Sequence, residues 1–430
     1  MKNFFQFAER ETNYRKETLA GITTFLSMAY ILVVNPIILS EAGIDKGALF
    51  TATALSAIVG SLLIGILANF PVGIAPSMGL NSFFTFSVVI GMGIDWEIAL
   101  TGVFIAGIIF MILSLLKIRE KIINVIPKDL KHAIAAGIGF FIAFVGLKNA
   151  GIVVGNEETF ISIGQLTTPT TALAAFGFVI TLMMLIRGIR GGIFYGIVIT
   201  TILGMIIGLV QIPTSVVGQV PSLEPTFGVV FQHLGDIFTP EILAVIFTFL
   251  FVAFFDTAGA LIAVASQAGL MKNNEIPNSG RALLADSTSG VVGAIFGTST
   301  TASFVESSAG VAVGGRTGFT SVVISACFFI ALFFSPILGV ITPEVTAPAL
   351  IIVGALMATE VKQIDWSRLE VVIPAFVTII MMPLTFSVAT GIALGFILYP
   401  FAMIAKKEWK QVHPIMYTLG GLFILYFIFL

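Results

Sequence analysis

The sequence predicts an all-α, multi-pass membrane protein built from two repeats of seven transmembrane helices. Of its 430 residues, 57% are hydrophobic and 10% are charged, and the mean hydropathy is +1.07. A soluble domain has about 25% charged residues. Seven apolar runs lie on each side of a more polar connection at 210–240, and the third run of each half is short and interrupted by small or polar residues. Two interrupted segments at corresponding places in two halves are typical of inverted repeats.

The apolar runs define the expected spans, since a helix needs about 20 apolar residues to cross a bilayer. In the first half they are 18–40, 48–70, 75–92, 97–116, 130–148, 170–187 and 191–209. In the second half they are 241–267, 282–298, 300–313, 317–339, 345–359, 370–385 and 388–405. We expect a cytoplasmic tail at 1–17, repeats at 18–209 and 241–405, an extracellular connection at 210–240 and a C-terminal segment at 406–430. For 414–430 two alternatives stay open, a further span and a helix along the membrane interface.

The distribution of basic residues supports this number of spans. With a cytoplasmic N-terminus, 19 of the 21 Lys and Arg residues fall on the cytoplasmic side, the exceptions being Lys46 and Lys148. Basic residues mark cytoplasmic loops, and one missed span would mix the two sides. We therefore expect a protein of the cytoplasmic membrane, with 117–131 and 360–369 inside and 210–240 outside.

Several other classes of protein are disfavoured. The net charge of −2 gives no indication of nucleic-acid binding. The single cysteine, Cys327, excludes an intramolecular disulfide and a Cys-based metal site. The three histidines, His132, His233 and His413, are scattered, so we expect no His-rich metal site. Since no nucleophile–base pattern is present either, we expect neither enzymatic activity nor a cofactor.

The two interrupted segments carry the most informative residues. One is 297–318, GTSTTASFVESSAGVAVGGRTG, and contains Glu306; the other is 70–86, FPVGIAPSMGLNSFFTF, and contains Asn81. Irregular backbone at membrane depth is tolerated only where protein buries it or it lines a water-filled cavity. Each segment therefore predicts an extended piece that enters a short helix pointing inward.

Two acids lie far from any predicted membrane edge, Glu306 and Asp256 in the span 241–267. Asp286, near the start of 282–298, is interpreted as a helix-end residue. An intramembrane acid is a functional-site candidate. The structural alternatives are that Glu306 binds nearby backbone or hydroxyl groups, and that Asp256 bonds across helices. For Asn81 the alternative is an interhelical hydrogen bond.

These residues belong to longer motifs that resemble a known family, the AzgA-like purine permeases within the nucleobase-cation symporter-2 group of xanthine/uracil permeases. The motifs are TFLSMAYI (24–31) with Asn35-Pro36, APSMGLNSFF (75–84), FDTAG (255–259) and VESSAGVAVGGRTG (305–318). The resemblance covers nearly the whole chain. It implies fourteen helices in two inverted repeats, divided into a core and a gate domain, with short antiparallel strands before helices 3 and 10.

The resemblance also implies a purine site between helices 3, 8 and 10. Its expected residues are Gly79, Asn81, Phe84, Ala253, Asp256, Phe304, Glu306 and Ser307, with Asp256 and Glu306 also in proton coupling. Phe84 has two interpretations, stacking on a flat ligand and ordinary packing. The chain departs from the family at Ala253, where an aspartate is usual.

The function implied is proton-coupled import of purine nucleobases by alternating access of the core against the gate domain, with Na+ as the alternative coupling ion. The partners expected are a purine, the coupling ion and membrane lipids, with no nucleic acid; a homodimer stays open. Purines present paired donors and acceptors, which a carboxylate and an amide can match. The alternatives are an inorganic-anion transporter or channel of the same fold, which two deep acids disfavour, and a transport-impaired scaffold, because Ala253 replaces an acid.

Overall fold

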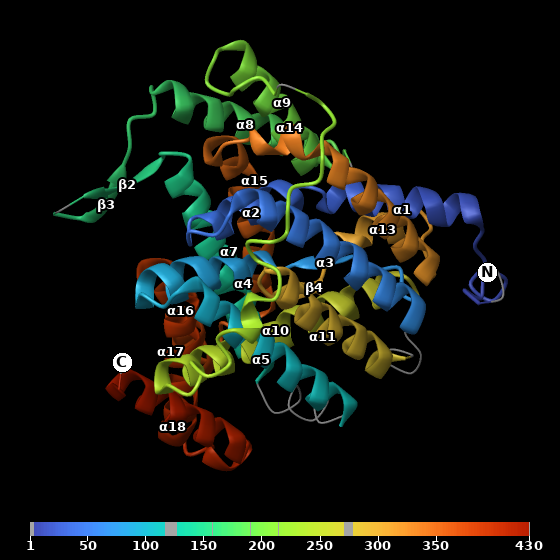
Figure 1. Ribbon diagram of the computed structural model, residues 1–430. Coiled ribbons are helices and arrows are strands. Elements are labelled where there is room, and N and C mark those ends of the chain that lie inside the picture. Colours follow the sequence, from blue (N-terminus) through green and yellow to red (C-terminus); the bar gives the residue numbers. More distant parts are fainter. Residues whose placement is uncertain are drawn as a thin grey trace.

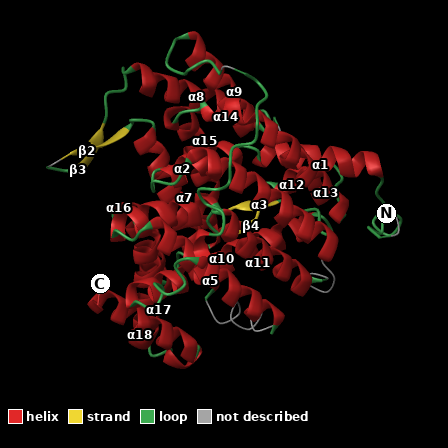
Figure 2. Ribbon diagram, viewed as in Figure 1, coloured by secondary structure: helices red, strands yellow, loops and turns green. Residues whose placement is uncertain are grey.

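Helices make up almost all of the regular structure. The computed structural model describes residues 4–116, 127–156, 158–189, 191–213, 215–270 and 278–429. Figure 2 shows helices throughout this part of the chain, with only short strands between them. Seven of the described helices are long and apolar enough to cross a membrane, and shorter helices occupy the other predicted spans.

The first predicted repeat is helical at each expected span. Its elements are α1 (Tyr14–Met28), α2 (Ile31–Ser40), α3 (Lys46–Leu67), β1 (Ile74–Pro76), α4 (Met78–Ser82), the π-helix η1 (Phe83–Gly91), α5 (Trp96–Leu115), α7 (Lys128–Asn149), β2 (Val153–Asn156), β3 (Phe160–Ile163), α8 (Pro169–Ile186) and α9 (Gly192–Ile206). The first span is divided into α1 and α2, and the third into β1, α4 and η1. Strands β2 and β3 form a hairpin that projects from the body in Figure 1.

The second repeat follows the same plan. After the 3-10 turn η2 (Val229–Phe231), its elements are α10 (Pro240–Gln267), α11 (Ser279–Phe296), β4 (Thr301–Ser303), α12 (Ser307–Ala312), α13 (Gly318–Ala331), η3 (Leu332–Phe334), α14 (Ser335–Gly339), α15 (Pro343–Ala358), η4 (Thr359–Gln363), α16 (Leu369–Leu384) and α17 (Val388–Ala405). The C-terminal segment forms η5 (Trp409–Gln411) and α18 (Pro414–Phe429). Helix α18 packs against α17, with the rings of Phe396 and Phe423 5.8 Å apart.

Side-chain caps define several helix starts. Asn13 accepts a hydrogen bond from the backbone N–H of Lys16, so α1 begins at Tyr14, four residues before the expected span. Asp45 caps α3 in the same way, and Thr168 caps α8 ahead of a proline. These oxygens satisfy backbone N–H groups that a helix terminus leaves unpaired, which is why such residues mark helix starts.

The two interrupted spans meet through their strands. β1 and β4 pair antiparallel, with Ile74 opposite Ser303 and Pro76 opposite Thr301. The pairing continues beyond the strands, because the N–H of Ser77 donates to the carbonyl of Thr300 at 2.9 Å. The predicted antiparallel strands before helices 3 and 10 are therefore confirmed. They satisfy backbone groups that would otherwise be unpaired at membrane depth.

Two groups of helices can be distinguished by their packing. In one, α3 packs against α11 and α13, α5 against α10 and α11, and α1 against α12 and α13. In the other, α7 packs against α15 and α16, α8 against α9 and α15, and α16 against α17. Helices α2 and α4 belong to the first group, since α2 packs against α3 and α4 packs against α2. Fewer contacts join the two groups, among them those of α4 with α7 and of α2 with α15. Each group takes helices from both repeats, which agrees with the expected core and gate domains.

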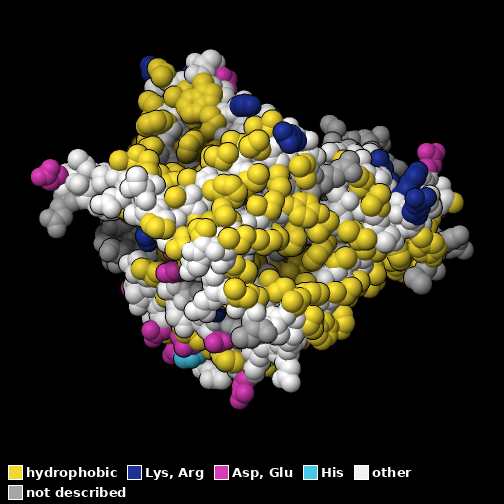
Figure 3. Space-filling view, turned by 90° about the horizontal axis from the view of Figure 1, so that it is seen from above, with side chains coloured by type: hydrophobic (Ala, Val, Ile, Leu, Met, Phe, Trp, Pro, Cys, Tyr) yellow, Lys and Arg dark blue, Asp and Glu magenta, His cyan; other side chains and the backbone are white. Residues whose placement is uncertain are grey.

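Many large apolar side chains of the described residues are exposed at the surface. Figure 3 shows hydrophobic side chains across much of the middle of one face, with most charged side chains toward its margins. Large exposed residues include Ile186, Ile206 and Leu369. Apolar surface of this extent is unfavourable in water but suits contact with lipid.

Candidate functional site

Glu306 lies at the break of the second interrupted span. It occupies the N-cap position of α12, three residues after the end of β4. Its side chain is partly exposed, and its Oε1 accepts a hydrogen bond of 2.8 Å from the hydroxyl of Tyr30, which is 1% exposed. The break between strand and helix thus presents a carboxylate whose position is held by a side chain of the first span.

The residues beside Glu306 have different surroundings. Phe304 is buried, and its N–H donates to the carbonyl of Gly73 at 2.9 Å. Ser307 is fully buried, and its hydroxyl accepts from the N–H of Gly73 at 3.0 Å. Together they attach the start of α12 to the segment before β1. The Ser307 hydroxyl therefore has a backbone partner, which is a structural role for a residue expected to contact substrate.

Asn81 is buried in α4 and bonded to the first span. Its Nδ2 donates to Oδ1 of Asn35 in α2. Asn35 in turn donates to the hydroxyls of Thr53 at 2.7 Å and Thr298 at 3.0 Å. The Oδ1 of Asn81 has no hydrogen-bond partner within the described part of the chain. A buried polar atom left unpaired costs roughly 1–3 kcal/mol, so this oxygen is a candidate acceptor for a ligand N–H.

Gly79 allows α4 to approach α7 closely. A Cβ at this position would lie 2.7 Å from Cγ2 of Ile138, which is closer than a side-chain contact permits. Because α4 and α7 belong to different packing groups, Gly79 lies where the two groups meet. Any larger residue would push these two helices apart.

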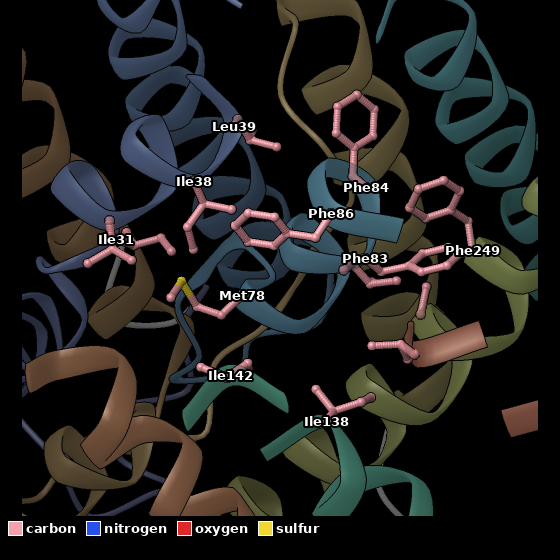
Figure 4. Packing of buried hydrophobic residues seen from close by; sticks show 14 of the residues in the cluster. Ile31, Ile38, Leu39, Met78, Phe83, Phe84, Phe86, Ile138, Ile142 and Phe249 are labelled. Carbon is pink, nitrogen blue, oxygen red and sulfur yellow. The ribbon is translucent and has the colours of Figure 1, made fainter. Parts of the chain in front are cut away.

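Phe84 packs against α10. It is fully buried, and its ring lies 6.3 Å from that of Phe249, while Phe83 and Phe249 form an edge-to-face pair at 5.0 Å. Figure 4 shows these three rings together, with Ile138 of α7 on the other side of the cluster. In this conformation the Phe84 ring contributes to the hydrophobic core.

Ala253 borders a small pocket between α5, α10 and α11. The lining residues are Ala106, Gly107, Phe110, Phe249, Leu250, Ala253, Asp286, Ser287, Gly290, Thr300 and Thr301. Its polar side is formed by Asp286 and hydroxyl groups, and its apolar side by aromatic and small residues. An acid therefore lines the space next to Ala253, although position 253 itself has none. The side chain of Asp256 lies outside the described part of the structure, so its roles stay predictions.

The interpretation of Asp286 as a helix-end residue is wrong. Helix α11 begins at Ser279, so Asp286 lies two turns inside it and is 1% exposed. Its carboxylate accepts from the hydroxyls of Thr257 at 2.7 Å and Ser303 at 3.2 Å. The error arose because the apolar run starts later than the helix. The small residues Ala282 and Gly293 on the same buried face were the available signal.

A further buried acid, Glu17, lies in the segment 1–17 that the sequence predicts to be a cytoplasmic tail. It is fully buried in α1. Its carboxylate accepts from the hydroxyls of Thr12, Thr317 and Thr320 and from the backbone N–H groups of Arg316, Thr317 and Thr320. It thus caps the start of α13 and connects α1 to the turn that follows α12. Its sequence neighbours are charged, so no hydropathy signal marks it.

The fold and this geometry define a membrane transporter of the inverted-repeat class, in which two interrupted spans meet at a polar site. The chain belongs to the Permease family, whose sequence pattern matches residues 15–394. It is 57% identical to the guanine/hypoxanthine permease PbuG of Bacillus subtilis (strain 168), over 100% of both chains. It is 41% identical to the adenine permease AdeP of Escherichia coli (strain K12), over 100% of this chain and 96% of AdeP. The resemblance inferred from the motifs is confirmed.

Solved structures of other transporters share the fold. The transmembrane domain of the cyanobacterial bicarbonate transporter BicA aligns with a TM-score of 0.62 at 18% identity, covering 91% of this chain and 97% of that domain. The murine anion transporter Slc26a9 in its inward-facing state aligns with a TM-score of 0.63 at 11% identity, covering 92% of this chain and 69% of that one. At these identities the likeness concerns the fold alone. The predicted inverted-repeat fold is confirmed, and the helices of the described residues are consistent with fourteen spans.

Proposed function

We propose that the protein imports purine nucleobases across the cytoplasmic membrane as a secondary active transporter. The observation that carries the proposal is the Glu306 carboxylate at the break of the second interrupted span, held by Tyr30. The names of its relatives, guanine/hypoxanthine and adenine permeases, support the same class of substrate. We include in this proposal the other residues expected to contact the purine, most importantly Asn81.

The chemistry of the site suits a purine. A purine presents ring N–H groups beside acceptor atoms, and a carboxylate such as that of Glu306 accepts from N–H donors. Asn81 Oδ1 is a second acceptor with no partner among the described residues. Asp286 lines the pocket beside Ala253, so an acid is present there despite the alanine. This supports an active transporter over an impaired scaffold.

Transport in this proposal proceeds by movement of the two packing groups of helices, the core and the gate, against each other. Gly79 lies at their contact, where α4 touches α7. Coupling to protons is assigned to Glu306 and Asp256, because an acid in a membrane cavity can bind and release a proton as its hydration changes. Sodium coupling is the alternative.

Uptake by cells tests whether the transported substrate is a purine or an inorganic anion. In a host without its own purine uptake, the protein should accumulate radiolabelled guanine, hypoxanthine or adenine, and excess unlabelled purine should reduce the signal. Bicarbonate and chloride should not compete. A protonophore should abolish accumulation, whereas replacement of sodium by choline should not. Accumulation of bicarbonate without purine uptake would favour the anion alternative, for which the shared fold is the only support.

The proposed orientation can be tested with single cysteines. Ser222 and Ser367 are both exposed, the first in the connection 210–240 and the second between η4 and α16. In a Cys327→Ala background, an impermeant thiol reagent added to intact cells should label Ser222→Cys and not Ser367→Cys, because the distribution of basic residues predicts that 360–369 lies inside. After the cells are opened, both should react. The reverse pattern, or labelling of both in intact cells, would refute a cytoplasmic N-terminus.

A further inference from the structure

The first span is divided at a position that faces the proposed site. Helix α1 ends at Met28 and α2 begins at Ile31, and the N–H groups of Leu32 and Val33 donate to carbonyls three residues earlier. This shift from four-residue to three-residue spacing tightens the turn. Tyr30 lies in this turn, and its ring is part of the main hydrophobic cluster.

The same span contacts both interrupted spans. Tyr30 donates to Glu306, at the start of α12. One and a half turns later, Asn35 accepts from Asn81 of α4 and donates to Thr298, just before β4. The polar groups of the two interrupted spans are therefore both held by the first span.

We propose that Tyr30 is a positioning residue that fixes the Glu306 carboxylate for purine binding. This inference rests on the proposed function. The phenol O–H donates to Oε1 at 2.8 Å, which restrains rotation of the carboxylate and orients Oε2. A group held in its binding geometry before the ligand arrives loses less entropy on binding. Because the Tyr30 ring is 1% exposed within the core, it acts through Glu306 and need not touch the purine.

Removing only the hydroxyl tests the inference. In Tyr30→Phe, purified and folded, equilibrium binding of guanine or hypoxanthine should weaken about tenfold, since hydrogen bonds to charged groups are among the stronger ones. As a matched control, Tyr195→Phe removes a hydroxyl from an exposed tyrosine on α9 and should change affinity less than about twofold. A melting curve for each variant monitors folding.

A double-mutant cycle separates positioning from packing. If Tyr30 acts through Glu306, then Tyr30→Phe should have an effect below about twofold in a Glu306→Ala background, because alanine leaves no acceptor for the Tyr30 hydroxyl. Equal losses in both backgrounds would show that the hydroxyl acts on packing and would overturn the inference. Incorporation of 4-aminophenylalanine at position 30 restores a donor on the same ring and should recover affinity to within about threefold of the wild type. Failure of this rescue, with the protein folded, would also overturn it.

The single variants distinguish this inference from the proposed function. If Glu306→Gln leaves purine affinity unchanged, the assignment of Glu306 to the substrate site fails, whatever Tyr30 does. If Glu306→Gln weakens binding while Tyr30→Phe matches the wild type, only the role of Tyr30 is refuted. Should Tyr30→Phe yield no folded protein, the aminophenylalanine variant is compared in both backgrounds, and an affinity far below wild type refutes positioning.

Discussion

Replacing Glu306 with glutamine is expected to weaken purine binding at least tenfold while the protein still folds and reaches the membrane. The substitution keeps the size and shape of the side chain but replaces an acceptor oxygen with a donor NH2. Glutamine can still accept the Tyr30 hydroxyl through its remaining oxygen. The new NH2 would then face the N–H groups of the purine, and a buried mispaired group costs roughly 1–3 kcal/mol.

Equilibrium binding of purine to the purified variant, beside a melting curve, measures this effect. Glu224→Gln is a matched control, because Glu224 is exposed in the connection 210–240; its purine affinity should equal that of the wild type. If Glu306→Gln is folded and binds purine as tightly as the wild type, Glu306 is not part of the substrate site. It would then retain, at most, a structural or proton-coupling role.

Replacing Glu17 with alanine is expected to give the largest loss of stability. The carboxylate is fully buried and receives hydrogen bonds from Thr12, Arg316, Thr317 and Thr320. Without it, several buried donors at the start of α13 have no acceptor, and loss of one partner from a buried charged network costs roughly 3–5 kcal/mol. The melting temperature in detergent should fall by roughly 5–10 °C.

Thermal unfolding of the purified variants checks this expectation. Glu17→Gln keeps one acceptor oxygen, so its melting temperature should lie between those of the wild type and Glu17→Ala. Glu9→Ala removes an exposed acid from the same segment and should have little effect. A Glu17→Ala protein with an unchanged melting temperature would show that water or rearranged neighbours replace the cap.

Much of the fold could be predicted because each span obeys a local constraint. A segment crosses the bilayer if its own residues are apolar over a sufficient length, whatever its neighbours are. The fourteen expected spans and the break before Glu306 follow from that rule. Asp286 shows its limit, since the hydropathy of 282–298 marks where apolar residues begin and not where helix α11 begins.

The helix type and the helix boundaries within the spans are harder to predict from the sequence. Nothing in FFTFSVVIG indicates that 83–91 forms a π-helix, because the residues would suit an α-helix equally well. The capped start of α1 extends the first helix into a charged segment, which places Glu17 in the protein interior. Most helical stability in proteins comes from tertiary packing, which the residues of 83–91 do not encode, whereas the early start of α1 depends on the local cap at Asn13.

By itself the sequence determined the membrane class, the spans and the two polar interruptions that carry Asn81 and Glu306, because a bilayer selects segments by their own composition and satisfies no unpaired backbone group. Only the tertiary structure decided the partners of these residues. Tyr30 meets Glu306 across 276 positions, and Asn35 meets Asn81 across 46. A hydrogen bond depends on the position and direction of both groups, and for residues on different helices these are set by how the helices pack, which no single segment encodes.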